Sequence, residues 1–330
     1  MAFKLFNPFE NLNFEDQTCF LTGEKITAEE VNTVFPSWIL ERYSLSDKKF
    51  TLMDQITSFR YADLKIPCAK NVVASAINPL EEEIEKAFAS GYDEVINLRH
   101  ERLFQWMARI IYGVLYHDLQ AEKKRAARRN IEFKLSPLLT RRFSLLHLML
   151  QSLVVPMKFS ERKPWSIFIF KSKISKDVFN YKDEPTNLNF SVTMNNFGIV
   201  ACLQDNGAVG EYQQDIVNKF SEKRLHPIQL EEIFARFIYS NYLLKKMPQY
   251  KIEEIEDHIY VESIPFANAE NDPLFGHWDE GLFAQVLADY WKPWGLIKKD
   301  IYEFPNSPTS FLENEFNNEI IEPDSIQLPF

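Results

Sequence analysis

Two cysteines begin short segments that have the spacing of zinc knuckles but lack the second ligand of each knuckle. Cys19 is followed three residues later by Thr22, and Cys68 is followed in the same way by Asn71. Two C-x-x-C pairs commonly hold one zinc ion between them. Threonine and asparagine supply neither a thiolate nor an imidazole. We therefore expect no metal at these four positions, with apolar side chains filling the space that a metal would occupy.

A second group of residues that could bind a ligand is the basic segment 121–142. It contains eight basic and two acidic residues, and Lys124, Arg125, Arg128 and Arg129 follow one another on a single predicted helix. Such a row of cations can bind the phosphates of a nucleic acid. The alternative is a solvated helix surface, and the net charge of −10 argues against a general nucleic-acid binder.

The other acid–base residues have simpler structural interpretations. His100 and Glu101 are adjacent on a predicted helix, where neighbouring side chains do not face each other. His147 lies in an apolar helix, which predicts a hydrogen-bonded core histidine. His277 and Asp279 have a spacing that occurs in metal sites, but Asp279 also fits a helix N-cap. We predict no catalytic residue.

The use of glycine argues against a nucleotide cofactor. Phosphate-binding loops need glycine because the backbone must approach the anion closely. The chain has nine glycines, and none of them forms a G-x-G or P-loop pattern. The nucleophile elbow, the H-E-x-x-H zinc motif and the EF-hand loop are absent from the sequence as well. We predict no cofactor.

Apolar periodicity predicts a series of helices after residues 1–80, which are expected to form short irregular elements and turns. Helices are expected at 80–89, at 101–119 with a continuation through the basic residues of 121–130, and at 143–155. Helix 101–119 is predicted to be amphipathic. Its apolar stripe lies opposite Arg102, Gln105, Arg109 and Tyr116.

The second half of the chain has the patterns of an antiparallel sheet packed with helices. Strict alternation of apolar and polar residues and a turn at 195–198 predict strands between 165 and 204, and another strand is expected at 257–264. Helices are predicted within 211–244 and 279–292. The last 28 residues contain six acids and no base, together with several prolines, so we expect an extended acidic tail.

Residues 15–90 resemble the HNH-endonuclease-like proteins, which are built on a ββα treble-clef scaffold. The resemblance rests on Val34-Phe35-Pro36-Ser37-Trp38-Ile39, on Cys68 as the start of a second knuckle, and on Leu80-Glu81 at the start of the following helix. It implies a structural zinc ion, and it implies an acidic residue and a general-base histidine just before the Phe-Pro pair. This chain has Asn32 and Thr33 at those two positions. Threonine cannot accept a proton near pH 7 as histidine can.

These observations together predict an α+β protein. It would contain a small degenerate treble-clef-like N-terminal module, a helical middle, and then an antiparallel sheet packed with helices. The predicted domains are an HNH-like module over 1–95, an α+β domain over 96–303 and the acidic tail over 304–330.

The predicted function is a non-catalytic binding or structural role on a metal-free HNH-like scaffold. The sequence does not identify the partner: an unknown protein is possible, and nucleic acid is not favoured. One alternative is a nucleic-acid-processing, endonuclease-like enzyme that grips phosphates with 121–142. Another alternative is a nucleic-acid-binding protein without catalysis. In either alternative the acidic tail could compete with nucleic acid for the basic segment.

We expect a cytoplasmic protein without membrane contact. The N-terminus lacks a signal-peptide pattern, and the most apolar run, 145–157, is too short to span a bilayer.

Overall fold

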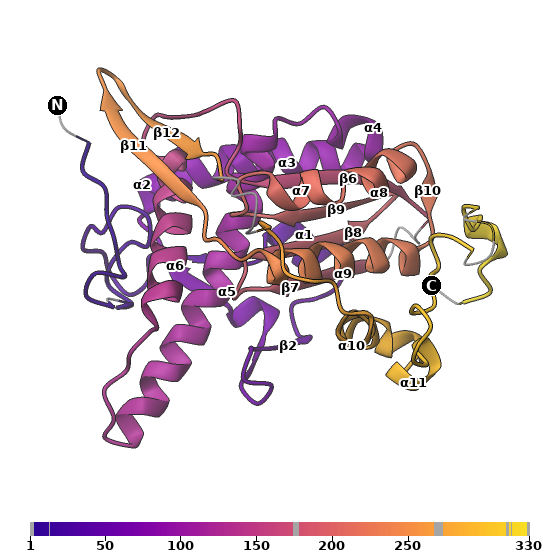
Figure 1. The fold of residues 1–330 in the computed structure, drawn as a ribbon. Helices are drawn as coiled ribbons and strands as arrows, with labels where there is room; N and C mark the ends of the chain where they lie inside the picture. Colours follow the sequence, from indigo (N-terminus) through magenta and orange to yellow (C-terminus); the bar gives the residue numbers. More distant parts are fainter. Residues whose placement is uncertain are drawn as a thin grey trace. The chain divides into compact units, whose positions relative to one another are not determined.

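Helices and mostly antiparallel strands make up the chain, which confirms the predicted α+β class (Figure 1). The computed structural model describes residues 3–12, 14–173, 178–266, 273–314, 317 and 319–328. Contacts divide the chain into two compact units. Unit 1 comprises 1–89, 98–160 and 251–262, and unit 2 comprises 90–97, 161–250 and 263–330.

These units follow boundaries different from those of the predicted domains. The prediction joined the helices after residue 95 to the sheet, whereas the contacts place residues 98–160 with the N-terminal segment. The predicted tail, 304–330, falls inside unit 2. Within the described residues, no helix is long and apolar enough to cross a membrane.

Short elements form the N-terminal part of unit 1. Strand β1 pairs antiparallel with β4, and β2 pairs antiparallel with β3. A helical stretch then follows, beginning with α2, passing through a π-helical turn and ending with α3. The elements are β1 (Val31–Thr33), α1 (Ser37–Arg42), β2 (Lys49–Thr51), β3 (Ser58–Arg60), β4 (Lys65–Pro67), α2 (Lys70–Val72), the π-helix Val73–Ile77 and α3 (Asn78–Ser90).

Two long helices form the centre of unit 1. Helix α5 spans His100–Arg128, and α6 spans Pro137–Leu150. Helix α6 starts earlier than predicted, because Ser136 caps it through the backbone N–H of Leu139. Strand β5 (Met157–Phe159) pairs in parallel with β12 (His258–Ile264), and β11 (Gln249–Ile255) lies on the other side of β12.

The prediction that α5 is amphipathic was wrong for its first half. Every side chain from Leu103 to Leu119 is buried, including the polar residues Gln105, Arg109 and Tyr116. The N-terminal segment supplies hydrogen-bond acceptors for Arg109 and Tyr116 on this face. For example, the Tyr116 hydroxyl donates a hydrogen bond to the carbonyl of Phe14 at 3.2 Å.

Unit 2 is built on a five-stranded sheet with the order β10-β6-β9-β8-β7. The predicted strands between 165 and 204 are confirmed, and the hairpin β8–β9 turns at Asn195, whose φ is +52°. Only the short β10 runs parallel to its neighbour. The strands are β6 (Ser166–Ser172), β7 (Phe179–Glu184), β8 (Asn189–Met194), β9 (Phe197–Cys202) and β10 (Arg224–Leu225).

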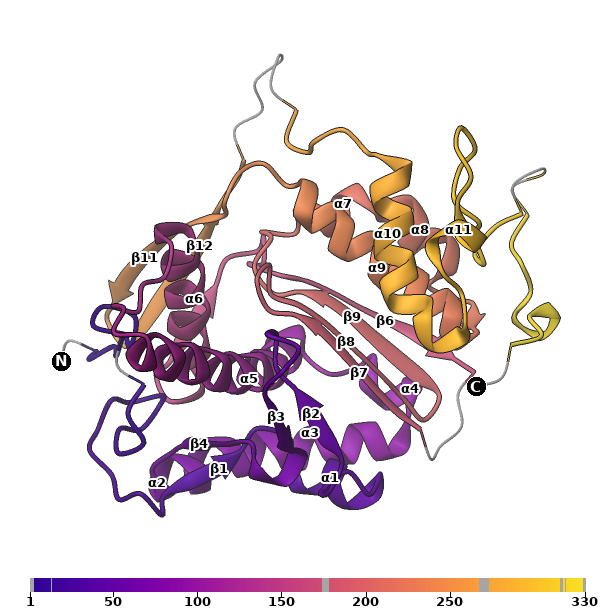
Figure 2. The ribbon, with the colours of Figure 1, turned by 90° about the horizontal axis from the view of Figure 1, so that it is seen from below.

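Helices α9 and α10 pack beside each other over this sheet (Figure 2). A β-carbon added to Gly198 of β9 would lie 2.0 Å from Leu230 Cδ2 of α9, so glycine lets the helix approach the strand closely. The predicted N-cap Asp279 of α10 is confirmed, and His226 caps α9. The helices of unit 2 are α4 (Tyr92–Val95), α7 (Ala208–Tyr212), α8 (Gln214–Phe220), α9 (Pro227–Leu243), α10 (Glu280–Trp291) and α11 (Lys298–Ile301).

The described part of the acidic tail is packed on unit 2 and does not run free as predicted. Gln229 of α9 donates hydrogen bonds to the carbonyls of Phe311 and Ile321, at 2.7 and 2.8 Å. Leu312 is buried in the cluster that α9 forms with the sheet. Glu315, one of the six tail acids, lies outside the described residues.

We predict that the contact between α9 and the sheet dominates the stability of unit 2. Phe237 of α9 is fully buried and packs edge-on against Phe168, with ring centroids 5.5 Å apart. Phe237→Ala should lower the free energy of unfolding by about 3–5 kcal/mol. Tyr242→Ala, on the same helix but 66% exposed, should change it by less than about 0.5 kcal/mol. Urea titration checks both values, and equal effects would contradict this packing.

Candidate functional site

The two cysteines of the predicted knuckles lie side by side in unit 1. Cys19 sits in a tight loop, in which the N–H of Gly23 donates to the carbonyl of Cys19 at 2.9 Å. The N–H of Phe20 donates to the carbonyl of Pro67 at 2.9 Å, which brings this loop to the end of β4. Cys68 follows directly, and its thiol donates a hydrogen bond to Cys19. Both cysteines are buried.

Cys19 is surrounded by hydrogen-bond donors. The N–H of Ala69 donates to Cys19 Sγ at 3.4 Å. The hydrogen bond from Cys68, helped by those from Ala69 and Thr22, lowers the pKa of Cys19 to about 5. The same shared proton raises the pKa of Cys68. The lowered pKa of Cys19 and the raised pKa of Cys68 favour a thiolate at Cys19 and a thiol at Cys68.

The remaining knuckle positions do not complete a metal site. Thr22 is half-buried and bonds to Cys19, whereas Asn71 is exposed in the first turn of α2. In the described part of the chain, no three side chains of His, Cys, Asp or Glu come together as a group that could hold a metal ion.

Tyr112 of α5 and His147 of α6 contact Phe20, the residue that follows Cys19. The ring of Phe20 stacks on Tyr112 of α5, with centroids 5.5 Å apart. His147 of α6 is fully buried and bonds to the carbonyl of Phe20 at 2.5 Å. Burial lowers the pKa of His147 to about 4. The prediction of a hydrogen-bonded core histidine is confirmed.

Strand β1 contains Asn32 and Thr33, the two positions at which the predicted resemblance would place a catalytic pair. Asn32 lies opposite Ile66, and Thr33 lies opposite Lys65. Both side chains are half-buried, and the Asn32 amide donates to the carbonyl of Thr33 at 3.3 Å. This carbonyl also accepts a hydrogen bond from Arg109 Nη1 at 2.9 Å. These two hydrogen bonds therefore fix the backbone of Thr33.

Arg109 belongs to a buried polar cluster that the sequence did not predict. Its guanidinium pairs with Glu81 of α3, and its Nη1 donates to the carbonyls of Thr33 and Val34. Trp38 and Trp106 donate to the other carboxylate oxygen of Glu81, at 3.1 and 3.3 Å. The cluster, which we call the Glu81 clamp, joins β1, α1, α3 and α5.

Close packing supports the Glu81 clamp. A β-carbon added to Gly113 of α5 would lie 2.6 Å from Val34 Cγ2, so glycine allows α5 to approach the end of β1. Gly113 follows Arg109 by four residues, so the two lie on one face of the helix. In the sequence, this spacing was a signal for close packing beside Arg109. The partner Glu81 lies 28 residues away from Arg109, which periodicity within one helix cannot reveal.

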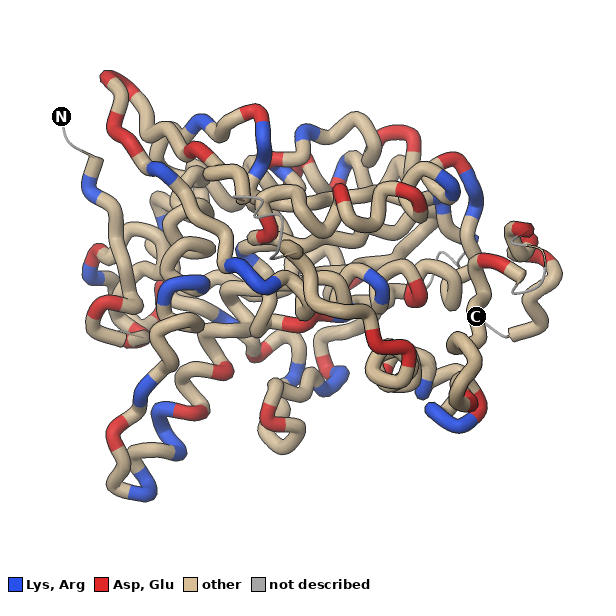
Figure 3. The backbone as a smooth tube through the Cα atoms, viewed as in Figure 1, with Lys and Arg blue, Asp and Glu red and all other residues tan. Residues whose placement is uncertain are grey.

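The end of α5 and the start of α6 project from the rest of unit 1, and Lys and Arg mark this end (Figures 1 and 3). Lys124, Arg128 and Arg129 are exposed there. Arg125, however, pairs with Glu122 at 2.6 Å and with Asp54 in the turn between β2 and β3. Hydrogen bonds from Thr57, together with those of Ile56 and Arg125, lower the pKa of Asp54. The predicted phosphate-binding group thus contains three exposed cations and one that is already paired.

Two acids of the described tail have cationic partners within unit 2. Glu313 pairs with Lys219 at 2.7 Å, and Asp324 pairs with Lys173. The predicted competition of the tail for segment 121–142 stays a prediction.

Comparisons of the chain with models of known protein families, with curated proteins and with solved structures found no match. The resemblance of residues 15–90 to HNH-like proteins stays a prediction.

We predict that the Glu81 clamp stabilises unit 1 far more than a neighbouring ion pair on the same helices. Glu81→Ala would leave Arg109, which is 1% exposed, without its counter-charge. The cost should be about 3–5 kcal/mol.

The pair Glu83–Arg102 also joins α3 to α5, but its side chains are 38% and 17% exposed. Glu83→Ala should therefore cost at most about 1 kcal/mol. Urea unfolding of the two variants measures the difference, and similar losses would show that the clamp has no special role.

We also predict that Cys19 makes stability depend on pH. Its pKa in the folded protein lies below the unfolded value of about 8.5, so the thiolate stabilises the fold above that value. This contribution is lost as the pH falls through about 5. The ultraviolet absorbance of the thiolate should disappear with a midpoint near pH 5, and Cys19→Ser should abolish that transition. A transition that persists in Cys19→Ser would refute this assignment.

Proposed function

We propose that this chain is a non-catalytic binding protein whose N-terminal module is a degenerate HNH-like scaffold without a metal ion. The observation that carries the proposal is the environment of Thr33. Its side chain cannot act as a general base near pH 7, and its carbonyl is occupied by Asn32 and Arg109. A strand that would present a catalytic histidine in an HNH enzyme here serves to anchor the Glu81 clamp.

The cysteine site supports the same proposal. A structural zinc ion takes four ligands, almost always thiolates and imidazoles. Cys19 and Cys68 supply two sulfur atoms, and Thr22 donates to the Cys19 thiolate where a third ligand would otherwise stand. The hydrogen bonds of Thr22, Ala69 and Cys68 satisfy the charge of the thiolate without a metal.

Metal content and strand cleavage test this proposal together. Elemental analysis of the purified protein should find no stoichiometric zinc, because two of four ligands are missing. Supercoiled DNA should stay uncut with Mg²⁺ or Mn²⁺. One zinc per chain that is lost in Cys19→Ser would overturn the metal-free scaffold. Cleavage that depends on a divalent ion and disappears in Thr33→Ala would overturn the absence of catalysis.

A second candidate function is nucleic-acid binding by the projecting end of α5 and α6. The specific observation is the exposure of Lys124, Arg128 and Arg129 within six residues at the C-terminal end of α5. Exposed Ile131 and Leu138 lie beside them in the chain, 61% and 53% exposed. The end of a helical hairpin that only contacts water needs neither the exposed cations nor the exposed apolar side chains. Phosphate binding needs the cations.

We predict that the triple substitution of Lys124, Arg128 and Arg129 by Ala weakens any binding to DNA or RNA and reduces its dependence on salt. If each cation displaces one counterion from duplex DNA, the plot of log binding constant against log salt concentration should become less steep by about 3. The control Lys292→Ala/Lys298→Ala/Lys299→Ala removes the same charge from exposed positions in unit 2. Fluorescence anisotropy at several salt concentrations measures both variants. Equal losses in the two, or no binding by the unmodified protein at low salt, would rule out this candidate.

A further inference from the structure

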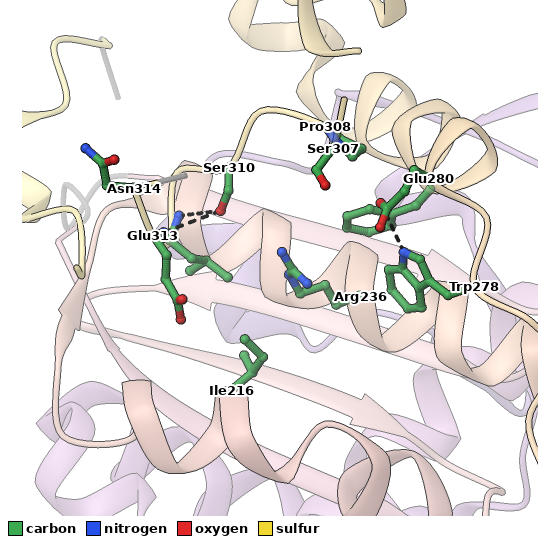
Figure 4. A pocket seen from close by; sticks show the side chains of 11 residues that line it. Ile216, Arg236, Trp278, Glu280, Ser307, Pro308, Ser310, Glu313 and Asn314 are labelled. Atoms are coloured by element: carbon green, nitrogen blue, oxygen red, sulfur yellow. Dashed lines mark hydrogen bonds between the residues drawn. The ribbon is translucent and has the colours of Figure 1, made fainter. Parts of the chain in front are cut away.

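Unit 2 contains a cavity that the sequence did not predict. Its volume is about 320 Å³, close to the lower limit of roughly 300 Å³ for small-molecule sites. The wall combines helices α8, α9 and α10 with the segment 307–314 of the tail (Figure 4). Charged residues face apolar ones across it, chiefly Arg236, Glu280 and Glu313 with Ile216, Trp278 and Phe283.

Arg236 is held in place behind the cavity. Its Nε and Nη2 donate to Glu232 Oε1, at 3.3 and 2.9 Å. Glu232 is fully buried and also accepts from the Ser310 hydroxyl and the Phe311 N–H, both at 2.7 Å. The guanidinium lies 5.2 Å from the ring centroid of Phe283. These contacts fix the guanidinium, whose side chain is 24% exposed and points into the cavity (Figure 4).

Carboxylates lie on both sides of Arg236. Glu280 accepts a hydrogen bond from Trp278 Nε1 at 3.2 Å, and Glu313 lies on the opposite side of the cavity (Figure 4). A cation flanked by two anions is complementary to a carboxylate that carries ammonium or guanidinium groups on either side.

The balance of charge defines the ligand further. The charged groups of the wall and their direct partners comprise two cations, Arg236 and Lys219, against three carboxylates, Glu232, Glu280 and Glu313. One negative charge is left over. A simple carboxylate would add to this excess, and a zwitterion would leave it unchanged. A basic α-amino acid has one carboxylate and two cationic groups, so it neutralises the site.

We propose that this cavity binds a free basic α-amino acid such as arginine or lysine. The ligand carboxylate binds Arg236, the two cationic groups of the ligand approach Glu280 and Glu313, and the aliphatic stem lies against Ile216 and Trp278. Binding would also tighten the tail, because segment 307–314 forms one wall.

Isothermal titration of the full chain with defined amino acids tests the proposal. L-Arginine or L-lysine should bind. Citrulline, which lacks the side-chain charge, and agmatine, which lacks the carboxylate, should each bind at least about tenfold more weakly than arginine. Equal affinity for arginine and citrulline, or binding of neither arginine nor lysine, would overturn the proposal.

Two variants separate the site from the fold. Arg236→Lys keeps the charge that compensates Glu232 but loses the planar fork, so the protein should fold and bind arginine at least about tenfold more weakly. Glu280→Gln should weaken binding similarly. The control Asp289→Asn, exposed on the same helix α10, should leave affinity unchanged. An unchanged affinity in Arg236→Lys and Glu280→Gln, or an equal loss in Asp289→Asn, would also overturn the proposal.

Discussion

The burial of the Arg109 guanidinium is the constraint on which the rest of unit 1 depends. A charge removed from water must find a counter-charge and hydrogen-bond acceptors, or it destabilises the fold by several kcal/mol. Glu81 and the carbonyls of Thr33 and Val34 meet that requirement. Because these groups come from α3 and from the end of β1, one side chain fixes the mutual positions of elements far apart in the sequence.

Protein contacts of the same kind hold the short N-terminal elements of unit 1. In a zinc knuckle, the binding energy of the ion holds short elements together. Here Phe20 stacks on α5, Trp38 and Trp106 share the Glu81 carboxylate, and the Cys19 thiolate takes hydrogen bonds from its neighbours. Long helices supply the partners for this packing. The short elements therefore belong to the same compact unit as α5 and α6.

Local patterns were sufficient to predict several regular elements, but not the short strands and helices before residue 73. The alternation in β8, the turn at Asn195 and the caps at His226 and Asp279 are signals that lie within a few residues of one another. The features that decide the sites depend on pairs distant in sequence. Glu232 holds the tail at Ser310, some eighty residues later, and this contact shapes the wall of the cavity around Arg236. Periodicity within α9 shows an apolar helix but cannot show which segment its buried acid binds.

The most direct test of this account is hydrogen exchange of the amides in 19–36 and 65–73, followed by mass spectrometry. We compare the protein with and without a chelator, and we compare it with Arg109→Met. If Arg109 holds this module, the chelator leaves amide protection unchanged and Arg109→Met lowers it throughout both segments. Loss of protection on adding the chelator alone, with Arg109→Met exchanging like the unmodified protein, would show that a metal ion holds the module instead.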